Sequence, residues 1–236
     1  MQPICLIPAR AGSKRIPRKN IRDFQGLPML HRAIRTAWAS GAFGRVIVST
    51  EDAEVADLAR AGGAEVPFVR PDALSDDYTG TTPIVTHAVQ WLTERGEAPP
   101  LVCCLYATTP LLAPADLARG RATLEAAPEL DFAFSATSFP FPIQRALRRL
   151  PAGGVEPMSP EHIQRRSQDL EEAWHDAGQF YWGRAEAWLA GRAIFSHRSA
   201  IVALPRYRVQ DIDTPEDWAR AELLFSALEA RGPAAT

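Results

Sequence analysis

Residues 7–20 read I-P-A-R-A-G-S-K-R-I-P-R-K-N, and the fold of the whole chain follows from this stretch. It continues an apolar run of buried-strand character at residues 4–7, which stops at Pro8 because proline cannot donate to a sheet ladder. Its small residues let the backbone approach a ligand closely, and its successive free N–H groups can form an anion-binding concavity. A loop of this kind at the carboxyl end of a first strand predicts an open α/β sheet with its ligand bound there.

The loop carries five cationic side chains, namely Arg10, Lys14, Arg15, Arg18 and Lys19. A solvated basic loop is the alternative interpretation, but Pro8 and Pro17 would stiffen a loop that solvation alone leaves free. Two common phosphate-binding motifs are excluded. The P-loop needs two glycines followed by Lys and Ser or Thr, and dinucleotide-binding loops carry G-x-G-x-x-G, whereas this loop contains Gly12 alone. We therefore predict an anion-binding loop of another type.

The bulk composition excludes several classes of protein. With 236 residues and 46% hydrophobic content, the chain can bury a full core, so we expect one domain over residues 1–236 with an elaboration. The formal net charge of −2 lacks the basic surplus of a nucleic-acid-binding protein. No apolar run approaches the roughly 18 residues that a membrane span requires, and we expect no signal peptide before the first strand.

The three cysteines do not indicate a disulfide-bonded or metal-binding protein. Cys5, Cys103 and Cys104 lie inside apolar, strand-like runs, so we interpret them as reduced core residues rather than as a disulfide or a metal set. A cytoplasmic soluble enzyme fits these features, as many other proteins would, and we expect small-molecule substrates and no binding to nucleic acid or membrane.

Strands and helices alternate along most of the chain at intervals typical of βαβ units. This alternation predicts an α/β fold with three layers and a mainly parallel sheet. The expected strands are residues 4–7, 46–48, 66–69, 101–105, 131–137, 178–183 and 200–204. The expected helices are residues 29–40, a segment ending near 62, residues 84–92, 114–127, a short one at 188–189, and 216–230.

Two helix starts are predicted in detail. Thr82 and Pro83 fit the N-cap and the first position of the helix that follows the polar loop at residues 70–83. Thr214 and Asp217 fit the start of the last helix, with a carboxylate near the positive end of the helix dipole.

Residues 138–172 interrupt the regular alternation. The segment contains F-P-F-P-I-Q-R-A-L, whose prolines prevent a regular core element, and it ends in a strongly polar run. It still carries large apolar residues, which argues against a disordered linker, and exposed apolar groups of this kind indicate a partner surface. These residues are Phe139, Phe141, Ile143, Leu147 and Leu150.

Asp211 and Asp213 form a second candidate site. Because they are two residues apart, their side chains project from the same face of an extended chain. Mg²⁺ commonly takes one or two protein carboxylates and completes its octahedron with phosphate oxygens and waters. The alternative is that Asp213 only assists the start of the helix after Thr214. A metal on this pair and the cations of the basic loop would together neutralise a triphosphate.

The basic loop and the D-x-D pair resemble the signature of the CMP-sialic acid synthetase family, the acylneuraminate cytidylyltransferases. The resemblance implies a Rossmann-like nucleotidyltransferase fold, and it implies Mg²⁺ or Mn²⁺ bound by Asp211 and Asp213. It further implies that Lys19, Arg10 and Asp211 are catalytic. The CTP-binding residues that it implies are Arg10, Ala11, Ser13, Lys14, Lys19, Asn20, Arg70 and Thr81.

Three further motifs resemble the branch of this family that uses pseudaminic acid. They are residues 139–147 (F-P-F-P-I-Q-R-A-L), 166–183 (R-S-Q-D-L-E-E-A-W-H-D-A-G-Q-F-Y-W-G) and 205–218 (P-R-Y-R-V-Q-D-I-D-T-P-E-D-W). The branch implies transfer of CMP from CTP to an acidic nine-carbon sugar, with release of pyrophosphate. Arginine is well suited to bind the sugar carboxylate. The sugar-binding residues implied are Tyr106, Gln144, Arg165, Arg166, Asp176 and Gln179.

Alternatives to this substrate and activity stay open. Sialic or legionaminic acid is the first, although the sialic acid branch has a glutamine followed by P-T-S-P where this chain has Tyr106 and A-T-T-P. A non-catalytic nucleotide-binding homologue is the second, and it would be expected to lose Lys19 or one Asp of the pair. In the family, the region that matches residues 138–172 packs into the other subunit. The resemblance therefore implies a homodimer in which this segment serves both dimerisation and the sugar site.

Overall fold

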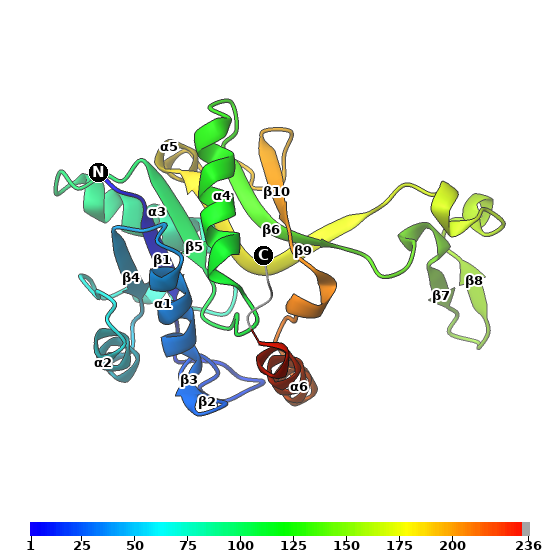
Figure 1. Ribbon diagram of the computed structural model, residues 1–236, viewed down its shortest axis with the longest axis horizontal. Coiled ribbons are helices and arrows are strands. Elements are labelled where there is room, and N and C mark those ends of the chain that lie inside the picture. The colour runs from blue at the N-terminus through cyan, green and yellow to red at the C-terminus, as the bar shows by residue number, and fades with distance from the viewer. Residues whose placement is uncertain (233–236) are drawn as a thin grey trace.

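The computed structural model describes residues 1–232, and its centre is a six-stranded sheet in the order β10-β6-β9-β5-β1-β4 (Figure 1). Every residue of β5 is buried, as are four of the five in β1. Strands that are apolar on both faces require cover on both faces of the sheet. The strands are β1 (Ile4–Pro8), β4 (Arg45–Ser49), β5 (Leu101–Leu105), β6 (Phe132–Ser138), β9 (Trp174–Arg184) and β10 (Ser199–Ala203).

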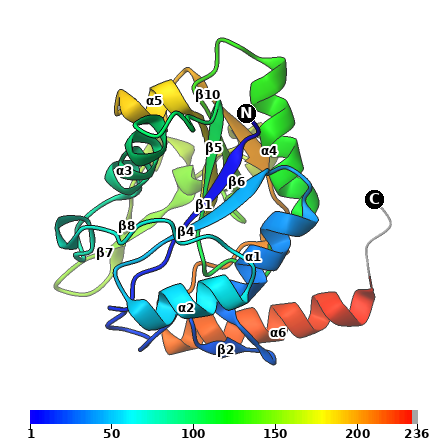
Figure 2. The same cartoon turned by 90° about the vertical axis from the view of Figure 1, so that its left-hand side faces the viewer.

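Helices lie on both faces of this sheet and complete three layers (Figure 2). The α-helices of the described residues are α1 (Met29–Ala39), α2 (Ala53–Ala61), α3 (Thr81–Thr93), α4 (Pro114–Ala126), α5 (Ala185–Leu189) and α6 (Pro215–Arg231). Residues of α1, α2 and α4 belong to the apolar core on one face, and residues of α3 and α5 belong to the core on the other. No helix formed by residues 1–232 is long and apolar enough to cross a membrane.

The sheet is mixed rather than wholly parallel. Five strands run in one direction, and β9 runs antiparallel to both of its neighbours, β5 and β6. The predicted α/β class is confirmed, but the alternation of elements did not predict the reversed strand. The chain leaves the sheet at the end of β6 and returns beside it as β9, and the described residues between them form no α-helix. A return without a crossover helix makes neighbouring strands antiparallel.

A third, smaller core joins the two candidate sites of the sequence. It packs α6 against the loop after β1 and against the hairpin of β2 (Asp23–Phe24) and β3 (Leu27–Pro28). Ile16 of the basic loop and Ile212, between the two aspartates, are both buried in it, with Trp218 beside them. Burial of these apolar side chains fixes the basic loop relative to the D-x-D segment.

The predicted strand at residues 66–69 is wrong. Only a single bridge, between Ile47 and Glu65, pairs this region with β4. Pro67 follows, and it lacks the N–H group that a continuing ladder would need. β4 therefore stays at the edge of the sheet.

One of the two predicted helix starts is correct. Thr214 accepts a hydrogen bond from the Asp217 backbone at 3.2 Å, and the Asp217 carboxylate accepts one from the Thr214 backbone, so the capping box is present. Thr82 is not the N-cap of α3, because the helix already begins at Thr81. Pro83 is then the third helical residue, which is tolerated because the N–H groups of a first turn have no intrahelical acceptor.

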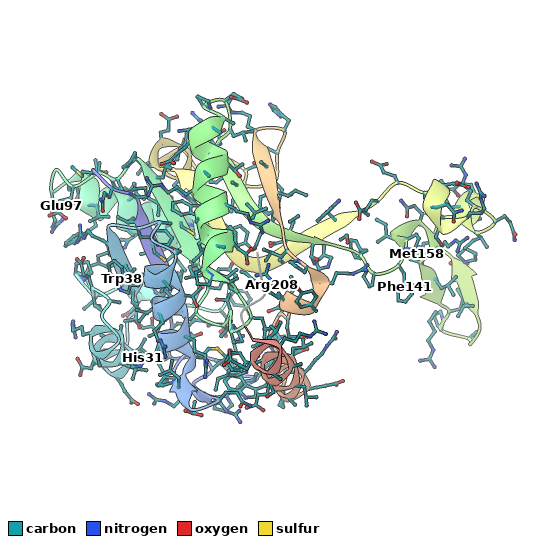
Figure 3. The ribbon with its side chains drawn as sticks, viewed as in Figure 1. His31, Trp38, Glu97, Phe141, Met158 and Arg208 are labelled. Carbon is teal, nitrogen blue, oxygen red and sulfur yellow. The ribbon has the colours of Figure 1, made fainter. Side chains whose placement is uncertain are left out.

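Residues 139–173 form an arm that projects from the body of the protein (Figures 1 and 3). Its outer part holds a small hairpin, β7 (Leu147–Arg149) and β8 (Val155–Pro157), and three short 3-10 turns (Ile143–Arg145, Pro160–His162 and Ser167–Asp169). Phe141 is 80% exposed there, and Leu147, Val155 and Met158 are exposed as well. The predicted departure from the regular fold is confirmed. Two other 3-10 turns, Asp72–Leu74 and Arg206–Arg208, belong to the body.

Candidate active site

A cavity of about 470 Å³ opens at the carboxyl ends of β1 and β5. In open α/β sheets, ligands bind outside the carboxyl ends of the strands. The loop after β1, the loop before α3 and the residues after β5 all contribute to its lining. The lining includes nine of the predicted site residues: Arg10, Ser13, Lys14, Lys19, Asn20, Arg70, Thr81, Tyr106 and Asp213.

The basic loop is held in one conformation by its own hydrogen bonds. Asn20 donates from its side-chain amide to the Arg10 carbonyl at 2.9 Å, which closes the loop on itself. Ala11 does not line the cavity, but its backbone N–H donates to the Glu51 carboxylate at 3.0 Å. The loop therefore presents its cations from a fixed backbone.

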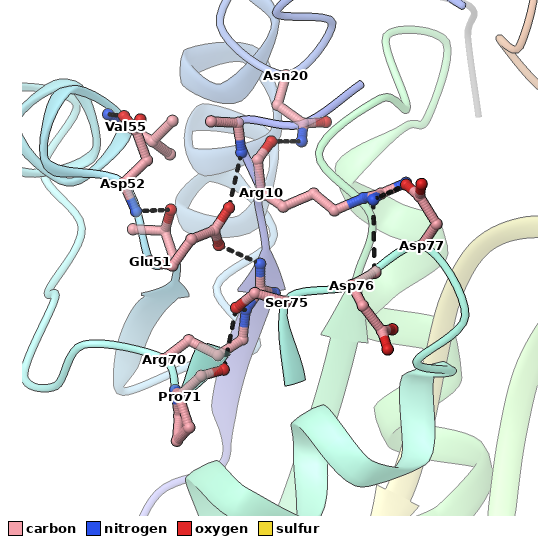
Figure 4. Close-up of polar contacts among 12 residues, drawn as sticks. Arg10, Asn20, Glu51, Asp52, Val55, Arg70, Pro71, Ser75, Asp76 and Asp77 are labelled. Atoms are coloured by element: carbon pink, nitrogen blue, oxygen red, sulfur yellow. Dashed lines mark hydrogen bonds and ion pairs between the residues drawn. The ribbon is translucent and has the colours of Figure 1, made fainter. Parts of the chain in front are cut away.

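Glu51 has a second partner, which sequence reasoning missed. Its other carboxylate oxygen accepts from the guanidinium of Arg70, which is only 1% exposed as a side chain (Figure 4). The charge-assisted hydrogen bond to the carboxylate stabilises the buried guanidinium. Arg70 is thereby held in the wall of the cavity. Glu51 lies just after β4, at the carboxyl end of a parallel strand. This position in the sequence could have indicated that Glu51 belongs to the site.

Lys19 connects the two candidate sites. Its Nζ donates to the backbone carbonyl of Ile212 and lies 3.3 Å from a carboxylate oxygen of Asp213. Arg15 contacts the second oxygen of the same carboxylate at 2.9 Å. The carboxylate of Asp213 is thus turned toward the basic loop, and the helix start is capped by Thr214 and Asp217 instead.

Asp211 lies near Asp213 but does not line the cavity. Burial, and next the charge of Asp213, raise the pKa of the Asp211 carboxyl. Carboxylates that repel one another suit a hard divalent cation, which takes oxygen ligands. Within residues 1–232, no cluster of three or more His, Cys, Asp or Glu side chains could hold a metal.

Asp77, before α3, is a further group that the sequence reasoning missed. Its carboxylate contacts both Lys14 and Arg10 (the pair with Arg10 is drawn in Figure 4). These hydrogen bonds, with Lys14 first, lower the pKa of Asp77 to about 2. The cavity is thus lined by five cationic and three anionic side chains: Arg10, Lys14, Arg15, Lys19 and Arg70 against Asp76, Asp77 and Asp213.

Tyr106 lies between Thr81, at the start of α3, and Tyr181 of β9. Its hydroxyl and that of Thr81 share a hydrogen bond of 2.6 Å, and burial raises the pKa of Tyr106 to about 12. Its ring packs edge to face on Tyr181, with the centroids 5.6 Å apart. The Tyr181 hydroxyl in turn donates to the carboxylate of Asp176, in β9.

The other predicted sugar-binding residues lie outside the cavity of a single chain. Gln144, Arg165 and Arg166 belong to the arm, where Arg166 pairs with its neighbour Asp169. Gln179 is buried in β9 and donates to the carbonyl of Arg208 at 2.7 Å. Asp176 also does not line the cavity and reaches it only through Tyr181 and Tyr106.

Comparison with known proteins finds similarity to cytidylyltransferases. A cytidylyltransferase family profile matches residues 4–148. The pseudaminic acid cytidylyltransferase of Campylobacter jejuni is 44% identical over 225 residues, which cover 95% of this chain and 97% of that protein. The N-acylneuraminate cytidylyltransferase A of Danio rerio is 30% identical, over 92% of this chain and 49% of that protein.

The fold also recurs in solved structures. The structure of CMP:2-keto-3-deoxy-manno-octonic acid synthetase complexed with CTP superposes with a TM-score of 0.70. The match covers 96% of this chain and 99% of that one, at 18% sequence identity. At this level of identity, the likeness shows that the two chains share a fold.

Proposed function

The chain belongs to the cytidylyltransferase family, and we propose that it transfers CMP from CTP to pseudaminic acid and releases pyrophosphate. The observation that carries this proposal is the cavity at the ends of β1 and β5, which gathers the cations of one loop opposite the carboxylate of Asp213. The identity to the Campylobacter jejuni enzyme over nearly its full length supports pseudaminic acid as the sugar.

The charge of the cavity favours a nucleoside triphosphate bound with a divalent metal. Its lining has two more cationic than anionic side chains. A triphosphate with one Mg²⁺ carries a net charge of about −2 at neutral pH, which complements that surplus. In this proposal the phosphates are received by the side chains of the basic loop, namely Arg10, Ser13, Lys14, Lys19 and Asn20. The Ala11 backbone borders the phosphates. The cytosine is held by Arg70 and Thr81.

The reaction needs positioning and stabilisation of charge more than covalent chemistry. A sugar hydroxyl attacks the α-phosphorus in line: a new P–O bond forms, the hydroxyl proton passes to water, and the bond to pyrophosphate breaks. Negative charge grows on the departing pyrophosphate, and preorganised cations stabilise it in the transition state. Lys19 suits this role, because the Ile212 carbonyl and Asp213 hold its ammonium group. We assign Lys19, with Arg10, to stabilisation of that charge.

Asp211 and Asp213 would hold Mg²⁺, or Mn²⁺ in its place. They fit such an ion because they are neighbouring oxygen donors, and the repulsion between them contributes to the raised pKa of Asp211. When bound, the metal would neutralise phosphate charge and lower the pKa of the attacking hydroxyl. Lys19 would then keep Asp213 in place through the contact already present.

Sialic and legionaminic acids are the alternative sugars. Tyr106 favours pseudaminic acid, because its hydroxyl is already paired with Thr81 and its ring is packed on Tyr181. A glutamine, as in the sialic acid branch, could not make the ring contact. We propose that Tyr106 and Asp176 border the sugar and that Gln179 supports β9 behind them.

We further propose a homodimer in which the arm of each subunit completes the site of the other. The arm projects from the body and exposes large apolar residues such as Phe141 and Met158 (Figure 3). Exposed apolar groups on a projecting segment favour a partner that covers them. Gln144, Arg165 and Arg166 would then meet the sugar bound by the partner subunit, although none of them reaches the cavity of its own chain.

The activity is tested by measuring pyrophosphate release from CTP with each of the three sugars. We expect release with Mg²⁺ and pseudaminic acid, and at least about tenfold lower kcat/KM with sialic or legionaminic acid. Release with another of these sugars at equal or higher efficiency would contradict the assignment of the sugar. CTP binding without release for any sugar would favour the non-catalytic homologue, although this chain retains Lys19, Asp211 and Asp213.

A further inference from the structure

The carboxylate of Asp77 stands where the basic loop would receive phosphate. It contacts the ammonium of Lys14 and the guanidinium of Arg10 together, so one carboxylate pairs with two of the cations that line the cavity. Arg10 also donates to the backbone carbonyl of Asp76 at 3.4 Å. An anionic side chain bridging two cations makes the same charge-assisted contacts that a phosphate oxygen would make.

We propose that Asp77 is an internal competitor for the phosphate subsite, displaced when CTP binds and restored when pyrophosphate leaves. This inference rests on the proposed function, since it assumes that Arg10 and Lys14 receive phosphates. The pairing cannot persist beside a bound triphosphate, because the carboxylate and the phosphates carry charge of the same sign. Competition of this kind weakens the binding of pyrophosphate and so promotes its release.

The local fold presents Asp77 to the cavity. The carboxylate of the neighbouring Asp76 accepts hydrogen bonds from the backbone N–H groups of Tyr78 and Thr79, at 2.9 and 2.6 Å. These bonds fold residues 76–79 into a tight turn with Asp77 at its inner side. The pKa of Asp77 is held at about 2, so the carboxylate stays charged across the working range of pH.

The same segment can move at little cost. Tyr78 is 94% exposed, and residues 75–79 bury no large apolar side chain. Segments with few buried apolar contacts open with small free energies. Exposed ion pairs are also weak, so a ligand with several phosphates can displace Asp77, while the pairing still competes with it.

The test compares the binding of inorganic pyrophosphate and of CTP, both without metal, by titration calorimetry. In Asp77→Asn we expect pyrophosphate to bind about fivefold or more tightly than in the unaltered protein, and CTP to bind more tightly as well. Asp72→Asn is the matched control, because it removes the same charge from the same segment but does not line the cavity. Asp77→Glu should restore weaker binding, since it keeps the competing carboxylate.

Unchanged or weaker pyrophosphate binding in Asp77→Asn, in protein with an unaltered melting temperature, would overturn the proposal and make Asp77 a group that positions Arg10. An equal gain in Asp72→Asn would overturn it too, because the effect would then be one of general charge. If the unaltered protein bound neither CTP nor pyrophosphate, the proposed function would fail first. Tighter binding of pyrophosphate should also appear as stronger product inhibition in Asp77→Asn.

Discussion

The ammonium group of Lys19 lies 3.3 Å from a carboxylate oxygen of Asp213, although 194 positions separate the two residues in the chain. The contact unites the loop after β1 with the segment before α6. It depends on the small core in which Ile16 and Ile212 are both buried. The basic loop and Asp213, one carboxylate of the predicted metal pair, therefore line the same cavity, whereas Asp211 does not line it.

Substitution of Lys19 should affect the transition state more than the binding of CTP. In Lys19→Ala we expect kcat to fall by roughly 10²-fold or more, the scale for loss of one preorganised donor, with a much smaller change in CTP affinity. Arg18→Ala is the control, because Arg18 belongs to the same loop but pairs with Glu54 and does not line the cavity. A Lys19→Ala variant whose only defect is a raised KM for CTP would contradict the assigned role.

The metal assignment predicts a loss of activity without loss of fold. In Asp211→Asn we expect Mg²⁺-dependent turnover to disappear, and Mn²⁺ binding measured by electron paramagnetic resonance to weaken by about tenfold or more. Excess chelator should abolish activity in the unaltered protein. Glu216→Gln, at the start of α6, is the control for loss of a nearby charge. Full activity in chelator, or Mn²⁺ binding that does not change in Asp211→Asn, would refute the assignment.

The sequence was sufficient to predict groups whose chemistry is local. The basic loop and the D-x-D pair each carry their charges within a few residues, and the apolar runs beside them predicted the strands that place them. Two features needed the folded chain. Glu51 and Asp77 act through partners 40 and 67 positions away, so no spacing rule predicts them. The pattern of charged and apolar residues in a sequence does not predict which side chains of a loop will face a cavity.

The direction of β9 was also beyond sequence reasoning. Residues 178–183 were expected to form a strand, and they lie within β9. A buried strand has the same apolar pattern whether its neighbours are parallel or antiparallel, so composition does not give direction. The antiparallel direction of β9 follows from the arm, because the chain leaves the end of β6, forms the arm and returns directly into β9. The failed strand at residues 66–69 has a local cause, because Pro67 lacks the N–H group that a continuing ladder would need.

A stability prediction concerns Asp131, far from the cavity. Its side chain is 3% exposed and pairs with both Arg192 and Arg198, which ties the ends of β6 and β10 together. We expect Asp131→Asn to lower the free energy of unfolding by about 1–3 kcal/mol in urea titrations at pH 7. Asp57→Asn removes an exposed pair with Arg60 and should cost less than about 1 kcal/mol. Equal losses in the two variants would contradict the structural role of Asp131.

The stabilisation by Asp131 should also depend on pH in a defined direction. The hydrogen bond from Arg198, followed by that from Arg192, lowers the pKa of the Asp131 carboxyl. A lowered pKa gives stabilisation that is complete above the unfolded-state value of about 3.9 and is lost as pH falls through the folded-state value. The difference between the unaltered protein and Asp131→Asn should therefore shrink below about pH 4. A difference that grows on acidification would show that the paired carboxylate is not its source.

The arm supplies the last prediction, dimerisation. Phe141 and Leu147 are 80% and 57% exposed in a single chain, and a partner that covers them would bury both. In the double variant Phe141→Asp, Leu147→Asp we expect monomers and weaker use of the sugar, because two buried carboxylates would be left unpaired. CTP binding should survive, because its cavity belongs to the body. Sedimentation at micromolar concentration measures the change, and Leu223→Asp, at an exposed position of α6, should remain dimeric. If the unaltered protein sediments as a fully active monomer, the arm does not complete a partner's site.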